Sequence, residues 1–226
     1  MFERHRIRLL VALALPVSMV GAGLWALTQL PPGAVVPIHF DADGRVNGWA
    51  DARWGLFLLP LLAAFTLGMT LLLPALEPRA EKIRQSQRAI LDISLAVQFL
   101  LTTIQGLIIA VALDRQPDVG RWVLLLVGMV YVVIGNMLGK VRWNHTVGIR
   151  TPWTLANERV WDKTHRFGGA VFFVAGLTLM SAALLSVPSS LGVPLMLTVT
   201  LFSALVCVIK SWLLWRRELL TSTKND

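Results

Sequence analysis

The chain has 226 residues, of which 55% are hydrophobic and 15% are charged, with a mean hydropathy of +0.65. Soluble domains carry about 25% charged residues, so this composition excludes an ordinary soluble protein. A formal charge of +8 could suggest a nucleic-acid binder, but the basic residues lie at the ends of apolar runs, where they act as a topology signal. The single cysteine, Cys207, excludes an intramolecular disulfide and a cysteine metal cluster.

Six apolar runs of about 20 residues are each long enough to cross a hydrocarbon core about 30 Å thick. They predict transmembrane helices at residues 9–30, 54–76, 89–113, 122–139, 169–187 and 193–215. The first run is too long for the core of a signal peptide, so we interpret it as a retained anchor. The expected fold is an all-α integral membrane protein, with two spans in residues 1–88 and four in residues 89–226.

The basic residues are divided unevenly between the two sets of connections. One set contains only Arg45, Arg53, Arg115 and Arg121, which leaves 17 of the 21 Lys and Arg residues for the other set and the termini. Because cytoplasmic connections are rich in Lys and Arg, this distribution predicts that both termini are cytoplasmic.

The connection between the first two spans is predicted to be a short, extended outer loop. Residues 36–40 favour a short strand, and the following HFDADG is typical of a tight turn. The segment DADGRVNGWADA has its glycine and its last residue in the wrong places for a calcium-binding EF-hand loop.

The cytoplasmic connection at residues 148–169 is polar and rich in tryptophan, although it lies between two apolar runs. Thr151 followed by Pro152 is typical of a helix N-cap with proline at the first helical position. The apolar residues that follow at helical spacing are Trp153, Val160, Trp161 and Thr164. This pattern predicts an amphipathic helix on the inner membrane surface, ending near His165. The helix is either only an anchor in the headgroups or a docking surface for a cytosolic partner.

Candidate metal ligands are sparse. His39, Asp41 and Asp43 could share a cation weakly, but a surface turn capped by the aspartates is the favoured interpretation. His145 and His165 are 20 residues apart without further ligands at a suitable spacing. We therefore expect structural histidines and no metal site.

Polar residues within the spans favour helix packing over transport. Gln98, Thr102 and Gln105 lie on one helical face and predict interhelical hydrogen bonds. Gly128, Gly135 and Gly139 share a face of the fourth span, which predicts close approach of a neighbouring helix. The spans lack the paired charges and matched helix breaks that a transporter is expected to have.

Two segments carry a resemblance to a known family. GNMLGKVRWNHTVGIRTPWTL, continuing to VWDKTHRFGG, resembles the signature region of the SdpI-like family of membrane immunity proteins against secreted killing-factor toxins. The outer VPIHFDADGRVNGW resembles an amino-terminal domain of uncharacterised function that is often found ahead of that region.

The resemblance implies a non-enzymatic protein of the bacterial inner membrane that protects its host from a membrane-active peptide. In the best-known member, a cytoplasmic winged-helix repressor is also captured at the membrane. No cofactor and no direct contact with nucleic acid is expected; the expected partners are the lipid bilayer, a peptide toxin outside and a repressor inside. The residues that the resemblance marks for toxin or partner binding are His39, Asp41, Asp43, Gly44, Trp49, Asn136, Asn144, Gly148, Arg150, Thr151, Pro152, Trp153, Thr154, Trp161, Thr164 and His165.

Two other classes of function remain as alternatives. A small-solute transporter or channel is the second hypothesis. An intramembrane enzyme that uses His39 with Asp41, or His165 with Asp162, is the weakest, because these residues lie outside the spans and no nucleophile or metal set accompanies them.

Overall fold

The structure is a computed structural model and describes residues 5–222. Its elements, in chain order, are α1 (Arg6–Gln29), β1 (Val35–Phe40), β2 (Val46–Asp51), α2 (Ala52–Leu76), α3 (Ala80–Ala112), α4 (Val119–Leu138), α5 (Pro152–Ala156), α6 (Glu158–Leu184) and α7 (Ser189–Ser222). Six of the helices in this part of the chain, all except the short α5, are long and apolar enough to cross a membrane. The predicted six-span membrane fold is confirmed.

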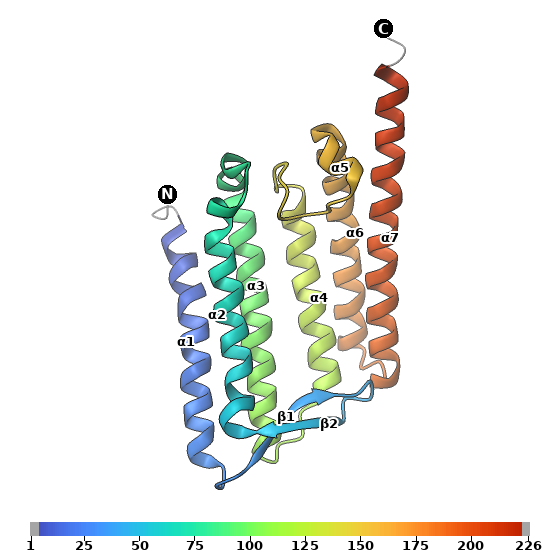
Figure 1. Ribbon diagram of the computed structural model, residues 1–226. Coiled ribbons are helices and arrows are strands. Elements are labelled where there is room, and N and C mark those ends of the chain that lie inside the picture. Colours follow the sequence, from blue (N-terminus) through green and yellow to red (C-terminus); the bar gives the residue numbers. More distant parts are fainter. Residues whose placement is uncertain (1–4, 223–226) are drawn as a thin grey trace.

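The six long helices stand side by side, with different structures at the two ends of the bundle (Figure 1). The start of α1, the end of α7, and α5 lie at one end, which we call the loop end. The β1–β2 hairpin crosses beneath the helices at the other, which we call the hairpin end.

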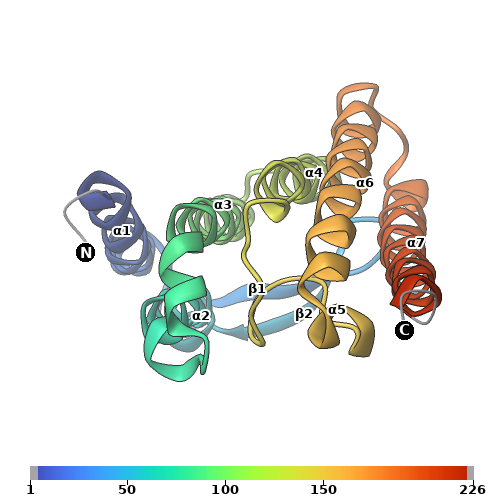
Figure 2. The same ribbon diagram turned by 90° about the horizontal axis from the view of Figure 1, so that it is seen from above.

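The helices form two groups. α1, α2 and α3 pack on one another, and α4, α6 and α7 do the same, while α3 and α4 join the two groups. Seen along the bundle, α2 and α7 stand on opposite sides, with the hairpin running between them (Figure 2).

Glycines on facing sides of α4 and α6 bring these two helices into backbone contact. A Cβ atom on Gly135 would lie 2.4 Å from the backbone nitrogen of Phe173, and one on Gly176 would lie 2.5 Å from the carbonyl oxygen of Gly128. Only glycine allows such an approach, so the predicted close packing of the fourth span is confirmed.

Two buried glutamines of α3 hold the first group together. Gln98 Nε2 donates to the carbonyl oxygen of Ala63 on α2 at 2.8 Å, and Gln105 Nε2 donates to that of Met19 on α1 at 2.8 Å. The predicted interhelical hydrogen bonds are confirmed for both glutamines. Thr102 instead donates to the carbonyl oxygen of Gln98 in its own helix.

All six spanning helices begin before the predicted apolar runs, and two of them differ by more than two turns: α3 begins at Ala80 instead of residue 89, and α6 at Glu158 instead of residue 169. Their first turns pack at the loop end, where Lys82 Nζ lies 2.6 Å from Glu158 Oε1. Hydropathy located only the apolar part of each helix, because the added turns are amphipathic.

The predicted amphipathic surface helix ending near His165 is wrong as a single element. α5 has five residues, and the extended Asn157 then caps α6 by accepting hydrogen bonds from the backbone of Arg159 and Val160. Residues 158–165 are therefore the first two turns of a spanning helix.

The connection between α1 and α2 is an antiparallel hairpin in which Val35 pairs with Asp51 and Pro37 with Trp49. The predicted strand at residues 36–40 is confirmed, but β2 was not predicted, because Gly48 interrupts its apolar pattern. That glycine faces His39, and a Cβ there would lie 2.9 Å from His39 Cβ. Glycine in a strand often marks such a close approach.

Candidate functional site

A buried carboxylate fixes the start of the loop after α4. Glu77, the C-cap of α2, has a side chain that is 0% exposed and lies under residues 145 and 146. It accepts hydrogen bonds from the backbone nitrogen and Nδ1 of His145 at 3.1 Å, from Thr146 Oγ1, and from the backbone nitrogen of Arg79. Burial alone would raise the pKa of Glu77, but these hydrogen bonds outweigh it and lower the pKa to about 2.

Asn144 holds the same turn from within. Its fully buried amide donates to the carbonyl oxygens of Arg142 and Val147 at 2.8 and 3.0 Å. Its Oδ1 accepts the backbone N–H groups of Thr146 and Val147, both at 2.7 Å. One side chain thus satisfies four backbone groups of an irregular segment, which would be costly to bury unpaired.

The predicted cap at Thr151 is confirmed and ties the loop to α7. Thr151 Oγ1 accepts from the backbone of Thr154, and Thr154 Oγ1 accepts from the backbone of Thr151, which forms a capping box with Pro152 in the first turn. Thr151 Oγ1 also lies 3.0 Å from Ser211 Oγ on α7.

Trp161 and His165 stack at the centre of the loop end, with ring centroids 3.9 Å apart. Both are buried; Trp161 Nε1 donates to the carbonyl oxygen of Val141 at 2.9 Å. His165 Nδ1 lies 2.9 Å from the carbonyl oxygen of Trp161, and Nε2 accepts the N–H of Ile149 at 2.9 Å. This approach requires Gly148, whose φ is +129° and whose Cβ, if present, would lie 2.4 Å from His165 Nε2. Trp161 therefore belongs to the interior and is not an anchor in the headgroups.

We call residues 140–165 the loop platform. Most of the sites that the resemblance marks in it are buried, including Thr164, whose hydroxyl has no hydrogen-bond partner in the described chain. The ones that reach the surface are Gly148, Arg150, Pro152 and, partly, Trp153. Arg150 Nη1 donates to the carbonyl oxygen of His145 at 2.9 Å, which holds the guanidinium against the platform. Asn136 is exposed on α4 and precedes the platform.

At the hairpin end, Asp41 organises the turn between the strands. Its Oδ1 accepts the N–H groups of Asp43 and Arg45 at 2.9 Å, and the N–H of Gly44, whose φ is +78°, donates to its carbonyl oxygen. The predicted aspartate-capped turn is confirmed. Within the described residues, no three His, Cys, Asp or Glu side chains come together in a way that could hold a metal ion.

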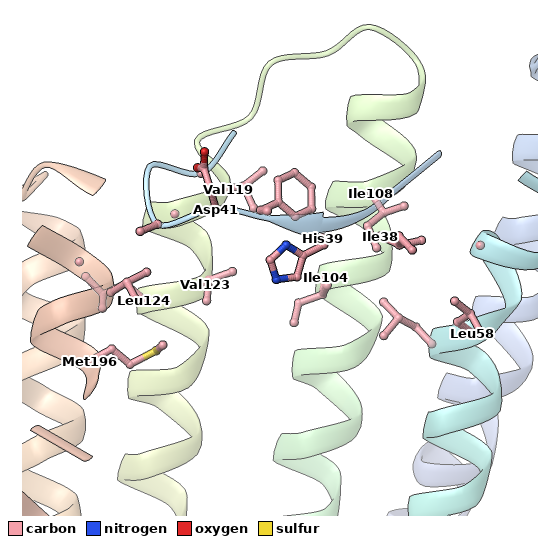
Figure 3. A pocket seen from close by; sticks show the side chains of 18 residues that line it. Ile38, His39, Asp41, Leu58, Ile104, Ile108, Val119, Val123, Leu124 and Met196 are labelled. Carbon is pink, nitrogen blue, oxygen red and sulfur yellow. The ribbon is translucent and has the colours of Figure 1, made fainter. Parts of the chain in front are cut away.

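Between the hairpin and the helices lies a cavity of about 360 Å³ (Figure 3). Its wall comes from the hairpin and four helices, with Leu58 of α2, Ile104 of α3, Val123 of α4 and Met196 of α7 among the lining residues. His39 is the one titratable ring in the wall and points between α3 and α4. The wall is otherwise almost entirely apolar, as in typical small-ligand sites.

The outer face of the hairpin carries exposed aromatic side chains. Trp49 on β2 is 54% exposed, and Trp54 at the start of α2 is 76% exposed. Indoles in such positions lie at the membrane–water interface, which places the mouth of the cavity near headgroup depth.

Comparisons with known proteins match two separate parts of the chain. Residues 140–211 match the SdpI/YfhL protein family, and residues 14–64 match a domain of unknown function, DUF1648. Over 96 residues, the chain is 32% identical to the Immunity protein SdpI of Bacillus subtilis (strain 168). Part of the chain is therefore similar to SdpI. The aligned part is 42% of this chain and 46% of that protein, so it spans about half the length of the relative. No solved structure matches the chain.

The SdpI-like region contains the whole loop platform, and the second match contains the hairpin. The predicted resemblances are therefore confirmed. The division at residue 88 stays a prediction.

Sequence reasoning missed several residues that build the two sites. Glu77, Ser86 and Ser211 each hold the platform from another helix, with Ser86 Oγ accepting the N–H of Arg142 at 2.8 Å. At the hairpin end, Asn47 Oδ1 is hydrogen-bonded to His39 Nδ1 at 2.5 Å. For Glu77 the one signal in the sequence was a carboxylate at the end of an apolar run, next to Pro78 and Arg79. Nothing in the sequence shows that this carboxylate is buried.

Proposed function

We propose that this protein is a non-enzymatic immunity protein of the bacterial inner membrane that protects its host from a secreted, membrane-active peptide. The observation that carries the proposal is the match of residues 140–211, which contain the loop platform, to the SdpI/YfhL protein family, together with the 32% identity over 96 residues to an immunity protein. In this chain the platform is a preorganised surface with an exposed Arg150 and a partly exposed Trp153.

The test of protection is expression in a sensitive bacterium. Cells that carry the protein are challenged with killing peptides from relatives of the host, and membrane potential is followed with a dye. Preserved potential relative to cells with an empty vector supports the proposal. Loss of potential at the same peptide dose, with immunoblots showing the protein in the membrane, contradicts it.

The proposal includes an orientation with the loop end in the cytoplasm and the hairpin outside, which the excess of basic residues at the loop end supports. Cysteines at Asp43 and Arg159, both exposed, in a Cys207→Ser background provide the test. An impermeant maleimide should label position 43 in intact cells and position 159 only after lysis. The reverse pattern contradicts the orientation.

The platform is also proposed to capture a cytoplasmic winged-helix repressor when toxin is present. A guanidinium and an indole on a rigid surface are the side chains that most often dominate binding between proteins. Arg150→Ala and Trp153→Ala should reduce recruitment of the repressor to membranes and leave protection intact. Equal loss of both activities with lower protein abundance would show instead that the two residues only support the loop.

A further inference from the structure

The cavity at the hairpin end has a definite shape and chemistry. At about 360 Å³ it lies at the lower end of the range for small-ligand sites, roughly 300–1,000 Å³, so it fits a few apolar side chains and not a whole helix. Two walls come from α2 and α7, which belong to different helix groups and stand on opposite sides of the bundle (Figure 2).

The charge at the rim favours a cationic ligand. Asp41 is the one acidic residue among the lining residues, and its side chain is turned toward the outside of the bundle end (Figure 3). Asp41 Oδ1 is used by the turn, which leaves Oδ2 for a ligand. Lys and Arg are absent from the lining, so an anionic lipid headgroup would meet a carboxylate and no counter-charge.

His39 adds a second polar group inside the rim. Its Nδ1 lies 2.5 Å from Asn47 Oδ1, so Nε2 is the ring nitrogen left for a ligand. An imidazole nitrogen that carries no proton accepts a hydrogen bond, which suits an N–H donor. An ammonium group or a peptide N–H fits both His39 and Asp41.

We propose that this cavity binds apolar side chains of a cationic peptide that lies in the outer membrane surface, with a positive group of the peptide at Asp41. The proposal rests on the proposed function, because it assigns the place where the membrane-active peptide is held. The exposed Trp49 and Trp54 set the mouth at the depth where an amphipathic peptide lies.

The direct test uses a short dansyl-labelled peptide of leucine and lysine and the full chain in phosphatidylcholine nanodiscs, with empty nanodiscs subtracted. Asp41→Asn keeps the oxygen that caps the turn and removes the charge, so binding should weaken about fivefold. Asp51→Asn, at the other end of the hairpin and outside the cavity wall, keeps the oxygen that caps α2; it is the matched control and should bind as the unmodified protein does.

A second pair of variants tests the cavity itself. Val193→Trp places an indole in the cavity and should weaken binding at least about tenfold, whereas Leu191→Trp, on an exposed position of the same helix, should not. Unchanged binding in both Asp41→Asn and Val193→Trp overturns the proposal. It is also overturned if a leucine and glutamate peptide binds equally well, or if a palmitoyl lysophosphatidylglycerol displaces the probe, since the cavity is then a site for lipid chains.

Protection assays separate this proposal from the proposed function. If the unmodified protein protects cells and Val193→Trp protects equally, the cavity assignment fails and the proposed function stands. If the probe binds through Asp41 and the cavity but the protein gives no protection, the proposed function fails and the cavity stands as a site for cationic peptides.

Discussion

The two ends of the bundle differ in how the backbone polar groups of their connecting segments are paired. At the loop end, side chains such as Asn144 and Glu77 turn inward and form hydrogen bonds with the backbone, so these polar side chains are already paired within the protein. At the hairpin end, the backbone pairs with itself, and the side chains are left to surround a hollow. Substitutions of the buried side chains at the loop end should therefore act on folding, and substitutions in the cavity wall at the hairpin end should act on binding.

The largest expected effect comes from Trp161→Ala. Removal of a fully buried indole that packs on His165 should lower the free energy of unfolding by about 3–5 kcal/mol. Trp49→Ala, at an exposed site on the hairpin, should change it by less than about 0.5 kcal/mol. Denaturant unfolding of both variants in the same detergent provides the measurement, and equal losses would contradict the contrast between the ends.

Glu77 gives the loop end a dependence on pH. The pKa of Glu77 is lowered to about 2 in the folded protein, from 4.5. The stabilisation is therefore fully present above about pH 4.5 and is lost as the pH falls toward 2, with a total on the order of 3 kcal/mol. Unfolding temperatures measured between pH 6 and pH 3 should fall in the unmodified protein.

The control for this pH effect is Glu77→Gln, which keeps the shape but has no titrating group. This variant should be less stable at pH 6, and its unfolding temperature should show a flatter pH dependence. A slope equal to that of the unmodified protein would assign the pH effect to another group.

Gly148→Ala and Gly33→Ala compare the ends at the level of the backbone. Both glycines have a positive φ, but a Cβ at Gly148 meets His165, whereas Gly33 faces open space. Gly33→Ala should cost about 1 kcal/mol from the backbone alone, and Gly148→Ala roughly 1–3 kcal/mol because the clash adds to the same strain. Similar losses of unfolding free energy in the two variants would show that the backbone at residue 148 can move away from His165.

The smallest effect on stability is expected for Arg150→Ala. The side chain is exposed and makes one hydrogen bond to a carbonyl oxygen, so the free energy of unfolding should change by less than about 0.5 kcal/mol. Unfolding measured beside repressor recruitment tests this directly. A large loss of stability would place Arg150 with the residues that fold the platform.

Features that depend on local chemistry were predictable from the sequence. Apolar length gave the six spans, Thr151 and Pro152 gave the cap, and Asp41 gave the turn. The glycines of α4 predicted close helix packing, because glycines at helical spacing in a membrane span allow a neighbouring helix to approach closely.

Features that depend on partners far along the chain were not predictable. The amphipathic face with Trp161 was predicted to lie on the inner membrane surface, as an anchor or as a docking surface, because an apolar stripe fits protein or membrane equally well and only the fold selects between them. The roles of Glu77 and Ser211 depend on contacts across 68 and 60 residues. The cavity, similarly, is formed where five separate elements meet, and no single stretch of sequence contains it.

α7 reaches from one end of the bundle to the other. At a rise of about 1.5 Å per residue, Met196 in the cavity wall and Ser211 beside Thr151 lie about 22 Å apart on one helix. Its proline, Pro194, precedes this stretch, so the helical hydrogen bonds between the two contacts are uninterrupted. One continuous helix therefore forms part of the cavity wall at one end of the bundle and, through Ser211, contacts the cap of α5 at the other.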